Sequence, residues 1–296
     1  MRFDSYHPAI NLIYFASAIG FTIWFDHPVY VGIAFAVAFA YSVKLKGLKG
    51  LVFNACLIPL AAAWALWYSY YTHFGVTVIG QNFTGNDMTL ESLVFGVIIG
   101  VRAAAVIMWM SCVFELFTSD KVVYLFGKVS PRLSLFLSIG LRGVPRIKDA
   151  ARKINPARCG IGRGCGQGNL FARLRNCAGV VSIVITWALE DFLQSSMSMK
   201  SRGYLLKGRT AFSIYRFDNR DRSLVLGIFL CLTFVMMAVM FNQVTILYDP
   251  EIIMNRITWA SYVFYCAYAV LLMLSLGLQV KAEIAFGRQR KLAETD

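Results

Sequence analysis

Long apolar runs separated by short polar turns dominate the pattern of hydrophobic and polar positions along this chain. An α-helix needs about 20 largely apolar residues to cross the hydrocarbon core of a bilayer. Six runs approach or reach that length, at residues 9–25, 29–43, 51–71, 92–117, 224–241 and 257–280. The first two are short, so flanking residues would have to complete those spans. The pattern predicts an all-α integral membrane protein with about six transmembrane helices.

The same pattern divides the chain into four parts. An N-terminal bundle of four spans is expected over residues 1–117, followed by a cytoplasmic, largely non-spanning segment over 118–222. A transmembrane hairpin is expected over 223–280, and a basic tail over 281–296. The segment between the fourth and fifth spans is the part that a membrane location alone does not explain.

The balance of charge supports a membrane location and sets the orientation. The chain is 58% hydrophobic and only 15% charged, whereas soluble domains carry about 25% charged residues. Its net charge is +13, and nearly all Lys and Arg fall on the side that receives the N-terminus, the segment 118–222 and the tail. The positive-inside rule makes that side cytoplasmic. We therefore expect a multi-pass protein of the cell membrane with both termini in the cytoplasm, and no nucleic acid is needed to explain the charge.

One charged residue lies well inside a predicted span. Arg102 stands about ten residues into the run 92–117, which makes it difficult for the side chain to extend to the interface. An ionisable residue at such a depth indicates a functional site by default. The other interpretation is that Arg102 snorkels outward or faces a neighbouring helix, and the residues alone leave these interpretations open.

The cytoplasmic segment predicts several further helices. Apolar positions at near-helical spacing over 121–142, interrupted by Pro131, indicate two short helices with apolar faces. A basic helix is expected over 143–158, with Pro145 near its start and Pro156 near its end.

A glycine-rich stretch at 159–168 predicts a flexible turn after these helices. It lacks the Gly-Lys-Ser/Thr ending of a P-loop and no strand precedes it, so nucleotide binding is not expected there. The nearby Cys159, Cys165 and Cys177 do not have the spacing of a zinc site, and the segment contains no histidine. We expect reduced thiols, no bound metal and no cofactor.

A long helix is expected over 169–199. Its middle, 178–189, is apolar enough to suggest a seventh span. A span there would place the basic run 200–222 outside the cell, against the positive-inside rule. We therefore expect this helix to lie along the membrane face or beneath the bundle, and to stop at Gly203, a residue type common just beyond helix ends.

Basic residues concentrate on both sides of that helix. Residues 142–175 hold nine Lys or Arg against one acidic residue, and residues 200–222 hold seven against two. Such a surface suits anionic lipid headgroups. It suits an acidic groove on a soluble partner equally well, because Arg pairs with carboxylates in a fork-like geometry.

Several motifs, taken in order, resemble one known family. Tyr6-His7-Pro8 precedes the first span, and the basic helix has the Pro-led start Gly143-Val144-Pro145. The most specific stretch is Ser198-Met199-Lys200-Ser201-Arg202-Gly203-Tyr204, followed by Gly208-Arg209-Thr210 and by Asp218 or Asp221. This order resembles the transmembrane T-component of energy-coupling factor (ECF) transporters, which take up vitamins and transition-metal ions. The resemblance covers most of the chain, and the cobalt-transport permease is a relative.

The resemblance implies two coupling motifs in the cytoplasmic segment. The second would be formed by Ser201, Arg202 and Gly203. The first reads Ala-Arg-Gly in the family and has two partial matches here, Ala157-Arg158-Cys159-Gly160 and Gly162-Arg163-Gly164. Counted back from Gly168-Asn169-Leu170, neither Arg falls at the expected place, so Arg158 and Arg163 both stay candidates.

The family's mechanism implies a non-catalytic subunit of an ATP-driven importer. Its Arg-tipped helix ends would sit in grooves of two ABC-type ATPase subunits, and ATP-driven movement would tilt a separate small membrane subunit that carries the substrate. The residues agree with this, because a terminal Arg supplies a strong directional contact and no catalytic constellation is found. Two other functions are weighed. An ordinary ABC permease would bind its own substrate, with only Arg102 as a hint, and a membrane-bound enzyme would need a polar cluster at one depth.

Overall fold

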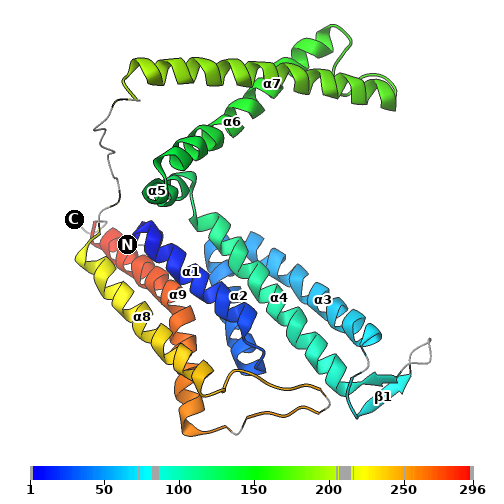
Figure 1. Ribbon diagram of the computed structural model, residues 1–296, viewed down its shortest axis with the longest axis vertical. Coiled ribbons are helices and arrows are strands. Elements are labelled where there is room, and N and C mark those ends of the chain that lie inside the picture. The colour runs from blue at the N-terminus through cyan, green and yellow to red at the C-terminus, as the bar shows by residue number, and fades with distance from the viewer. Residues whose placement is uncertain are drawn as a thin grey trace. The chain divides into compact units, whose positions relative to one another are not determined.

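The structure, a computed structural model, is built almost entirely from helices (Figure 1). It describes residues 3–72, 74–81, 87–204, 206, 215, 217–249, 251–255 and 257–293. The α-helices are α1 (Pro8–Trp24), α2 (Pro28–Lys46), α3 (Leu48–Tyr71), α4 (Leu90–Leu116), α5 (Ser119–Val129), α6 (Pro131–Gly160), α7 (Leu170–Ser201), α8 (Asn219–Met240) and α9 (Trp259–Ala293). A 3-10 turn, η1 (Phe3–Ser5), precedes α1, and two short antiparallel strands, β1 (Val78–Gln81) and β2 (Asp87–Thr89), lie between α3 and α4.

Six of these helices are long and apolar enough to cross a membrane, which confirms the predicted fold class. Five of them, α2, α3, α4, α8 and α9, match predicted spans. The sixth is α7 instead of α1, because α7 has 32 residues with a long apolar stretch whereas α1 has only 17 residues. At 1.5 Å per residue, α1 is about 25 Å long, which is less than the hydrocarbon core of about 30 Å. Five of the predicted spans are therefore matched by length and composition. The predicted span 9–25 falls short of the length, whereas α7, which we expected to lie along the membrane face or beneath the bundle, reaches it.

The described residues form two compact units. Unit one is Met1–Thr118 together with Tyr215–Asp296, and it contains α1 to α4, α8 and α9. Unit two is Ser119–Ile214, and it contains α5, α6 and α7. The apolar bundle and the basic segment of the sequence therefore correspond to separately packed parts of the chain.

α1 and α2 begin with the same local device. In each helix a proline occupies the first position, where the missing N–H is not needed for a helical hydrogen bond. The preceding histidine caps the helix through Nδ1, which accepts from the backbone N–H two residues further on. The distances are 3.2 Å from Ala9 N to His7 and 3.2 Å from Val29 N to His27. The His-Pro pairs thus fix where both helices start.

The start of α1 lies against the start of α8. Asp221 Oδ1 accepts a hydrogen bond from the His7 backbone N–H at 3.5 Å, and its Oδ2 accepts one from the Asp218 N–H at 3.1 Å. The His7 ring also lies 5.5 Å from the Phe217 ring. Two separate parts of the family-like pattern therefore meet in space, whereas the Gly208-Arg209-Thr210 part lies outside the described residues.

Small residues allow α3 and α4 to approach closely. A Cβ atom at Gly100 would lie 2.6 Å from the carbonyl oxygen of Ala61, and one at Gly96 would lie 2.8 Å from that of Ala65. Helices in membranes associate through such small-residue contacts because lipid offers no hydrophobic driving force between them. Glycine is therefore required at both positions for this helix pair.

The core of unit one combines aromatic rings with a few hydrogen bonds. Three large side chains are fully buried there: Tyr14 of α1, Tyr41 of α2 and Trp109 of α4. The Trp109 ring contacts both tyrosine rings. The Tyr14 hydroxyl donates to the Leu272 carbonyl at 2.6 Å and lies 2.9 Å from the Ser275 hydroxyl of α9. α1 is therefore an integral part of the bundle in spite of its length.

In unit two, α6 is longer than the sequence predicted. We expected a new helix near residue 143, with Pro145 near its start and Pro156 near its end, but both prolines lie inside the unbroken helix Pro131–Gly160. A proline removes one backbone hydrogen bond without ending a helix that is held by its neighbours. The predicted break before Pro131 is confirmed, since Ser130 separates α5 from α6.

α6 and α7 pack against each other as an antiparallel pair. Near the connection between them, Ile154 of α6 is buried with Val180 and Val184 of α7. Further along, Arg146 Nη1 of α6 forms an ion pair with Asp191 Oδ2 of α7 at 2.6 Å. This packing supports α6 across the positions of its internal prolines.

Candidate functional site

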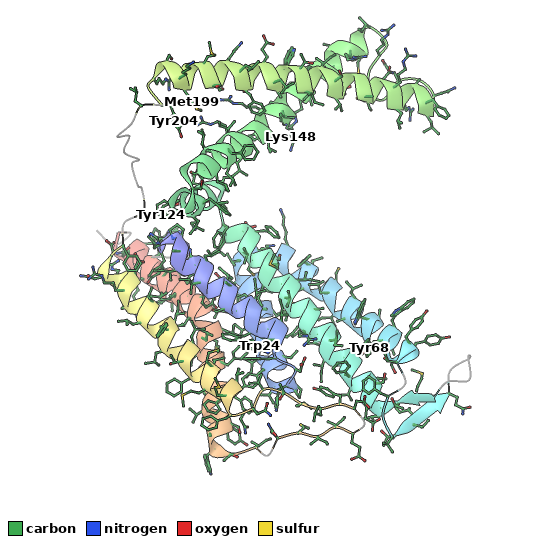
Figure 2. The ribbon with its side chains drawn as sticks, in the orientation of Figure 1. Trp24, Tyr68, Tyr124, Lys148, Met199 and Tyr204 are labelled. Atoms are coloured by element: carbon green, nitrogen blue, oxygen red, sulfur yellow. The ribbon has the colours of Figure 1, made fainter. Side chains whose placement is uncertain are left out.

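α7 ends in a well-defined turn that carries the family-like motif. Arg202 is the C-cap, and Gly203 follows with φ of 76°, a left-handed conformation that glycine adopts without strain. The Gly203 N–H donates to the Lys200 carbonyl at 3.1 Å. The Tyr204 N–H donates to the Met199 carbonyl at 3.1 Å (both residues are labelled in Figure 2). The two bonds form a Schellman motif, which confirms Gly203 as the predicted stop of the helix.

The side chains at this end are directed to solvent. Arg202, Ser201 and Lys200 are all exposed. The Ser201 hydroxyl donates to the Ser198 carbonyl at 2.9 Å and so completes the last turn. Within the described part of the chain, the Arg202 guanidinium has no hydrogen-bond or ion-pair partner. The helix end therefore presents a free, fork-shaped cation beside a second positive charge.

α6 ends in the same kind of turn. Its C-cap is Ile161, and Gly162 follows with φ of 73°. The Gly162 N–H donates to the Cys159 carbonyl at 3.1 Å. The Arg163 N–H donates to the Arg158 carbonyl at 2.9 Å. The hydrogen bonds match those at the end of α7 position by position, so the two long helices of unit two finish in equivalent geometry.

The structure separates the two arginines that the sequence left as candidates. Arg158 is half-buried, and its Nε donates to the Arg163 carbonyl at 3.4 Å. A Cβ atom at Gly179 of α7 would lie 2.8 Å from Arg158 Nη1, so this guanidinium lies directly on α7. Arg163 is exposed beyond the helix end, and Ala157 is exposed on the last turn. Of the two, Arg163 is the cation that a partner can reach.

Neither arginine occupies the position that Arg202 holds on α7. That position, the C-cap before the left-handed glycine, is occupied on α6 by Ile161, which is 72% exposed. Ile161 was not predicted from the sequence, because the motif that the sequence resembles here contains an arginine. The signal was present in the spacing to Gly168, which placed neither Arg158 nor Arg163 where the family pattern requires.

Side-chain hydrogen bonds hold the turn between α6 and α7 in shape. The Cys165 N–H donates to Asn155 Oδ1 at 3.1 Å. Asn176 Nδ2 donates to the Gly164 carbonyl at 3.3 Å and to the Gln167 carbonyl at 3.2 Å. The stretch 159–168 is the turn that the sequence predicted, but these bonds fix it more firmly than the expected flexible loop.

The three cysteines of this region lie around the same turn as free thiols. Cys177 Sγ donates to the Cys165 carbonyl at 3.8 Å. Hydrogen bonding with Cys177 raises the pKa of the Cys165 thiol, and burial raises it further. Among the described residues, no group of three or more His, Cys, Asp or Glu side chains has the arrangement to hold a metal ion.

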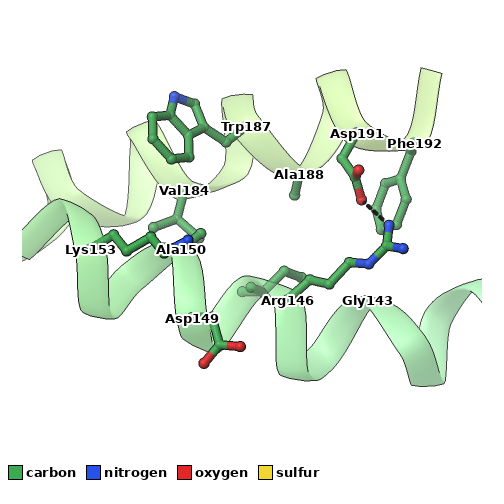
Figure 3. A pocket seen from close by; sticks show the side chains of 11 residues that line it. Gly143, Arg146, Asp149, Ala150, Lys153, Val184, Trp187, Ala188, Asp191 and Phe192 are labelled. Atoms are coloured by element: carbon green, nitrogen blue, oxygen red, sulfur yellow. Dashed lines mark hydrogen bonds and ion pairs between the residues drawn. The ribbon is translucent and has the colours of Figure 1, made fainter. Parts of the chain in front are cut away.

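A groove of about 360 Å³ runs along the seam of α6 and α7 (Figure 3). The Arg146–Asp191 ion pair lies at one end, beside the Phe192 ring. A Cβ atom at Gly143 would lie 3.2 Å from that ring, so glycine is what brings the helices together there. The charges at this end neutralise each other, and the groove is best described as an open packing seam.

Much of the remaining surface of α7 is apolar and exposed. Only 11% of its most apolar stretch is buried. Large side chains that are at least half exposed include Leu170, Phe171, Leu174, Val181, Ile185, Trp187, Leu189, Leu193 and Met197. An exposed apolar surface of this extent marks a site that contacts lipid or another protein.

Arg102, the charged residue inside a span, forms an ion pair with Asp26 in the turn between α1 and α2. Its Nη1 also donates to the Ile23 carbonyl at 3.3 Å. The turn is held from the other side by the loop before α9, since the Tyr248 hydroxyl donates to the Asp26 carbonyl at 2.8 Å. The structure therefore supports the interpretation that Arg102 faces its neighbours.

Replacing Arg102 with alanine is expected to destabilise the bundle, because the Asp26 carboxylate would lose its partner in a partly desolvated position. The loss should be about 1–3 kcal/mol, between the values for exposed and buried ion pairs. The double variant Arg102→Gln with Asp26→Asn should recover part of it. Melting of the detergent-purified variants, followed by tryptophan fluorescence, measures both. Equal melting temperatures for the native chain and Arg102→Ala would rule out a stabilising role.

The comparison with known proteins gives one similarity of limited extent. No family model matches this chain. Over 102 residues, 34% of its length, the chain is 29% identical to the energy-coupling factor transporter transmembrane protein EcfT of Lactobacillus helveticus (strain DPC 4571). The matched stretch covers 37% of that relative, so the chain spans just over a third of its length. That relative belongs to the family that the motifs resemble.

Proposed function

We propose that this chain is the energy-coupling transmembrane subunit of an ECF-type ABC importer. The observation that carries the proposal is the pair of helix ends in unit two. α6 and α7 end in Schellman turns of equivalent hydrogen bonding, and both ends are exposed. One of them presents Ser201, Arg202 and Gly203, the residues of the family-like coupling motif.

Such helix ends are suited to receive force from a soluble partner. α6 and α7 have 30 and 32 residues, so each is about 45–50 Å of continuous helix. The free guanidinium of Arg202 can form two parallel hydrogen bonds to a carboxylate, which fixes direction as well as affinity. Two ABC-type ATPase subunits would each hold one helix end, and ATP-driven closure of the pair would displace α6 and α7.

The exposed apolar surface of α7 supports a second contact in the same proposal. A small membrane subunit that carries the substrate would pack on this surface, and movement of α7 would tilt it. The substrate, a vitamin or a transition-metal ion by the resemblance, would then be chosen by that subunit. The basic residues around α7 also support a cytoplasmic position for unit two and for both termini.

The two other functions receive less support. An ordinary ABC permease would need a substrate site of its own, and the one sequence feature that suggested it was Arg102. That residue is engaged by Asp26 and Ile23, so an ion pair accounts for it. For a membrane-bound enzyme, no specific observation in the described residues points to a reaction.

Purification of the tagged chain from its native membranes tests the proposal. The expected result is that ATPases with nucleotide-binding motifs copurify in stoichiometric amounts, and that a tag on the ATPase recovers this chain. A monodisperse, folded chain that copurifies with no ATPase from either direction would overturn the proposal.

A further inference from the structure

Two cysteine thiols meet where the turn 159–168 lies against the N-terminal part of α7. Cys177 Sγ donates to the Cys165 carbonyl at 3.8 Å, and the two thiols are also in hydrogen-bonding contact with each other. Both side chains are partly exposed, so a reagent in water can reach them. The two sulfur atoms are therefore within reach of each other at an accessible position, which is the first requirement for a disulfide.

Side-chain hydrogen bonds hold the backbone on both sides of this pair. Asn176, the residue before Cys177, donates through Nδ2 to the Gly164 carbonyl at 3.3 Å. From α6, Asn155 Oδ1 accepts from the Cys165 N–H at 3.1 Å. Because these bonds keep the two thiols together, each has a high effective concentration toward the other. A disulfide is therefore expected to close within the pair in preference to a lasting bond with a second molecule.

The charges around the pair are all positive. Residues 158–177 contain four arginines and no Asp or Glu. Arg163, Arg173 and Arg175 are exposed, and the Arg158 guanidinium lies against Gly179 of α7. A surface of one sign raises the local concentration of small molecules of the opposite sign. The pair is therefore placed to react with a small, negatively charged reagent.

The other cysteines are less suited to such a reaction. Four of them lie in helices that can cross a membrane, where a charged reagent does not enter: Cys56, Cys112, Cys231 and Cys266. Cys159 is nearer, since its Sγ occupies the place that a Cβ atom at Gly164 would take. It is the alternative partner for Cys165, but the hydrogen bond between thiols favours Cys177.

We propose that Cys165 and Cys177 form a thiol–disulfide site for negatively charged, low-molecular-weight disulfides such as glutathione disulfide. The thiolate of one cysteine attacks a sulfur of glutathione disulfide, and one glutathione leaves and takes up the proton that the cysteine lost. The thiolate of the other cysteine then attacks the protein sulfur of the mixed disulfide, and the second glutathione leaves in the same way. Two cysteine thiols are oxidised to one disulfide, and glutathione disulfide is reduced to two glutathiones.

The closed disulfide would tie α7 to the turn before it. The glutathione pool of the cytoplasm is strongly reducing, so a pair located there is expected to be open at rest and to close when glutathione disulfide accumulates. The inference goes beyond the proposed function and does not depend on it, because the site consists only of residues of this chain.

Peptide mapping of the folded, detergent-purified chain tests the site. Trypsin places Cys165 and Cys177 in the separate peptides 164–173 and 176–200, so only a disulfide can join them. After equilibration with glutathione disulfide and blocking of free thiols, the joined peptides are expected to exceed glutathione adducts of either peptide by at least about tenfold. Glutathione adducts alone, or two unmodified peptides, would overturn the proposal.

Two serine variants decide the pairing. Cys177→Ser should remove the joined peptides, whereas the matched variant Cys159→Ser should leave them at the native level. The cysteine Cys159 falls in a third tryptic peptide, 159–163, so a bond from it to Cys165 is recognised directly. Joining of that peptide in place of 176–200 would overturn the assigned pair.

A comparison of two disulfides tests the preference for negative charge. Glutathione disulfide is negatively charged at neutral pH and cystamine is positively charged. In low salt the pair is expected to close at least about threefold faster with glutathione disulfide, and the difference should shrink as salt is added. Equal rates in low salt, or a faster reaction with cystamine, would overturn the assigned class of reagent.

Discussion

Replacing Arg202 with glutamate is expected to release an ATPase subunit from the detergent-purified complex, with a loss of affinity of at least about 30-fold. The reason is that Arg202 is exposed and without a partner within the described residues, so a groove that binds α7 must supply its counter-charge. The carboxylate introduced by Arg202→Glu would face that counter-charge and be repelled by it. Quantitative immunoblotting of the copurified ATPase against the tagged chain measures the effect.

Two matched variants separate the contact of Arg202 from a general effect of charge. Arg202→Lys keeps the positive charge but cannot form two parallel hydrogen bonds to a carboxylate, so an intermediate loss of affinity for the ATPase is expected. Arg142→Glu makes the same charge change at an exposed position of α6 far from its end, and should retain the ATPase. Retention of the ATPase by Arg202→Glu at the native level would contradict the role assigned to α7.

Replacing Gly203 with valine is expected to unwind the end of α7 and to abolish coupling without disturbing unit one. The φ of 76° at Gly203 is strained for a β-branched residue, at about 1–3 kcal/mol. A Cβ atom there would also lie 2.9 Å from Leu206 Cδ1. The Schellman bonds would break, and Arg202 would lose its fixed direction.

Hydrogen exchange read by mass spectrometry checks this prediction on the peptide 195–204. Faster exchange in that peptide is expected, together with loss of the ATPase and an unchanged melting temperature of unit one. Gly140→Val is the control, because Gly140 lies inside α6 with open space around its Cβ position and no positive φ. Unchanged exchange in Gly203→Val would show that the turn does not depend on glycine.

The sequence was sufficient for five of the six spans and for the end of α7. Long apolar runs directly indicate helices that can cross a membrane. A glycine after Lys200 and Arg202 indicates the end of a helix, because glycine adopts the left-handed backbone conformation found there. Both signals are local. The continuity of α6 through Pro145 and Pro156 was not predictable in this way, because packing against α7 decides whether a helix survives an internal proline.

The partners of the arginines also depended on tertiary structure. Arg102 was an unexplained charge in the sequence, and its partner Asp26 lies 76 residues away in a turn. The residues that flank Arg158 matched the first coupling motif and suggested that its side chain could reach a partner. In the structure its guanidinium lies on Gly179 of α7. The C-cap position of Ile161 is defined by the backbone hydrogen bonds at the end of α6, which the sequence does not show.

The central claim is that the end of α7 lies in an ATPase groove. The most direct measurement places a photo-reactive benzophenone amino acid at Ser201, which is exposed and adjacent to Arg202, and irradiates native membranes. The account predicts an adduct with the mass of this chain plus one ABC-type ATPase, mapped to the ATPase surface by peptide sequencing. Adducts formed only with lipid, or only with proteins that are not ATPases, would contradict it.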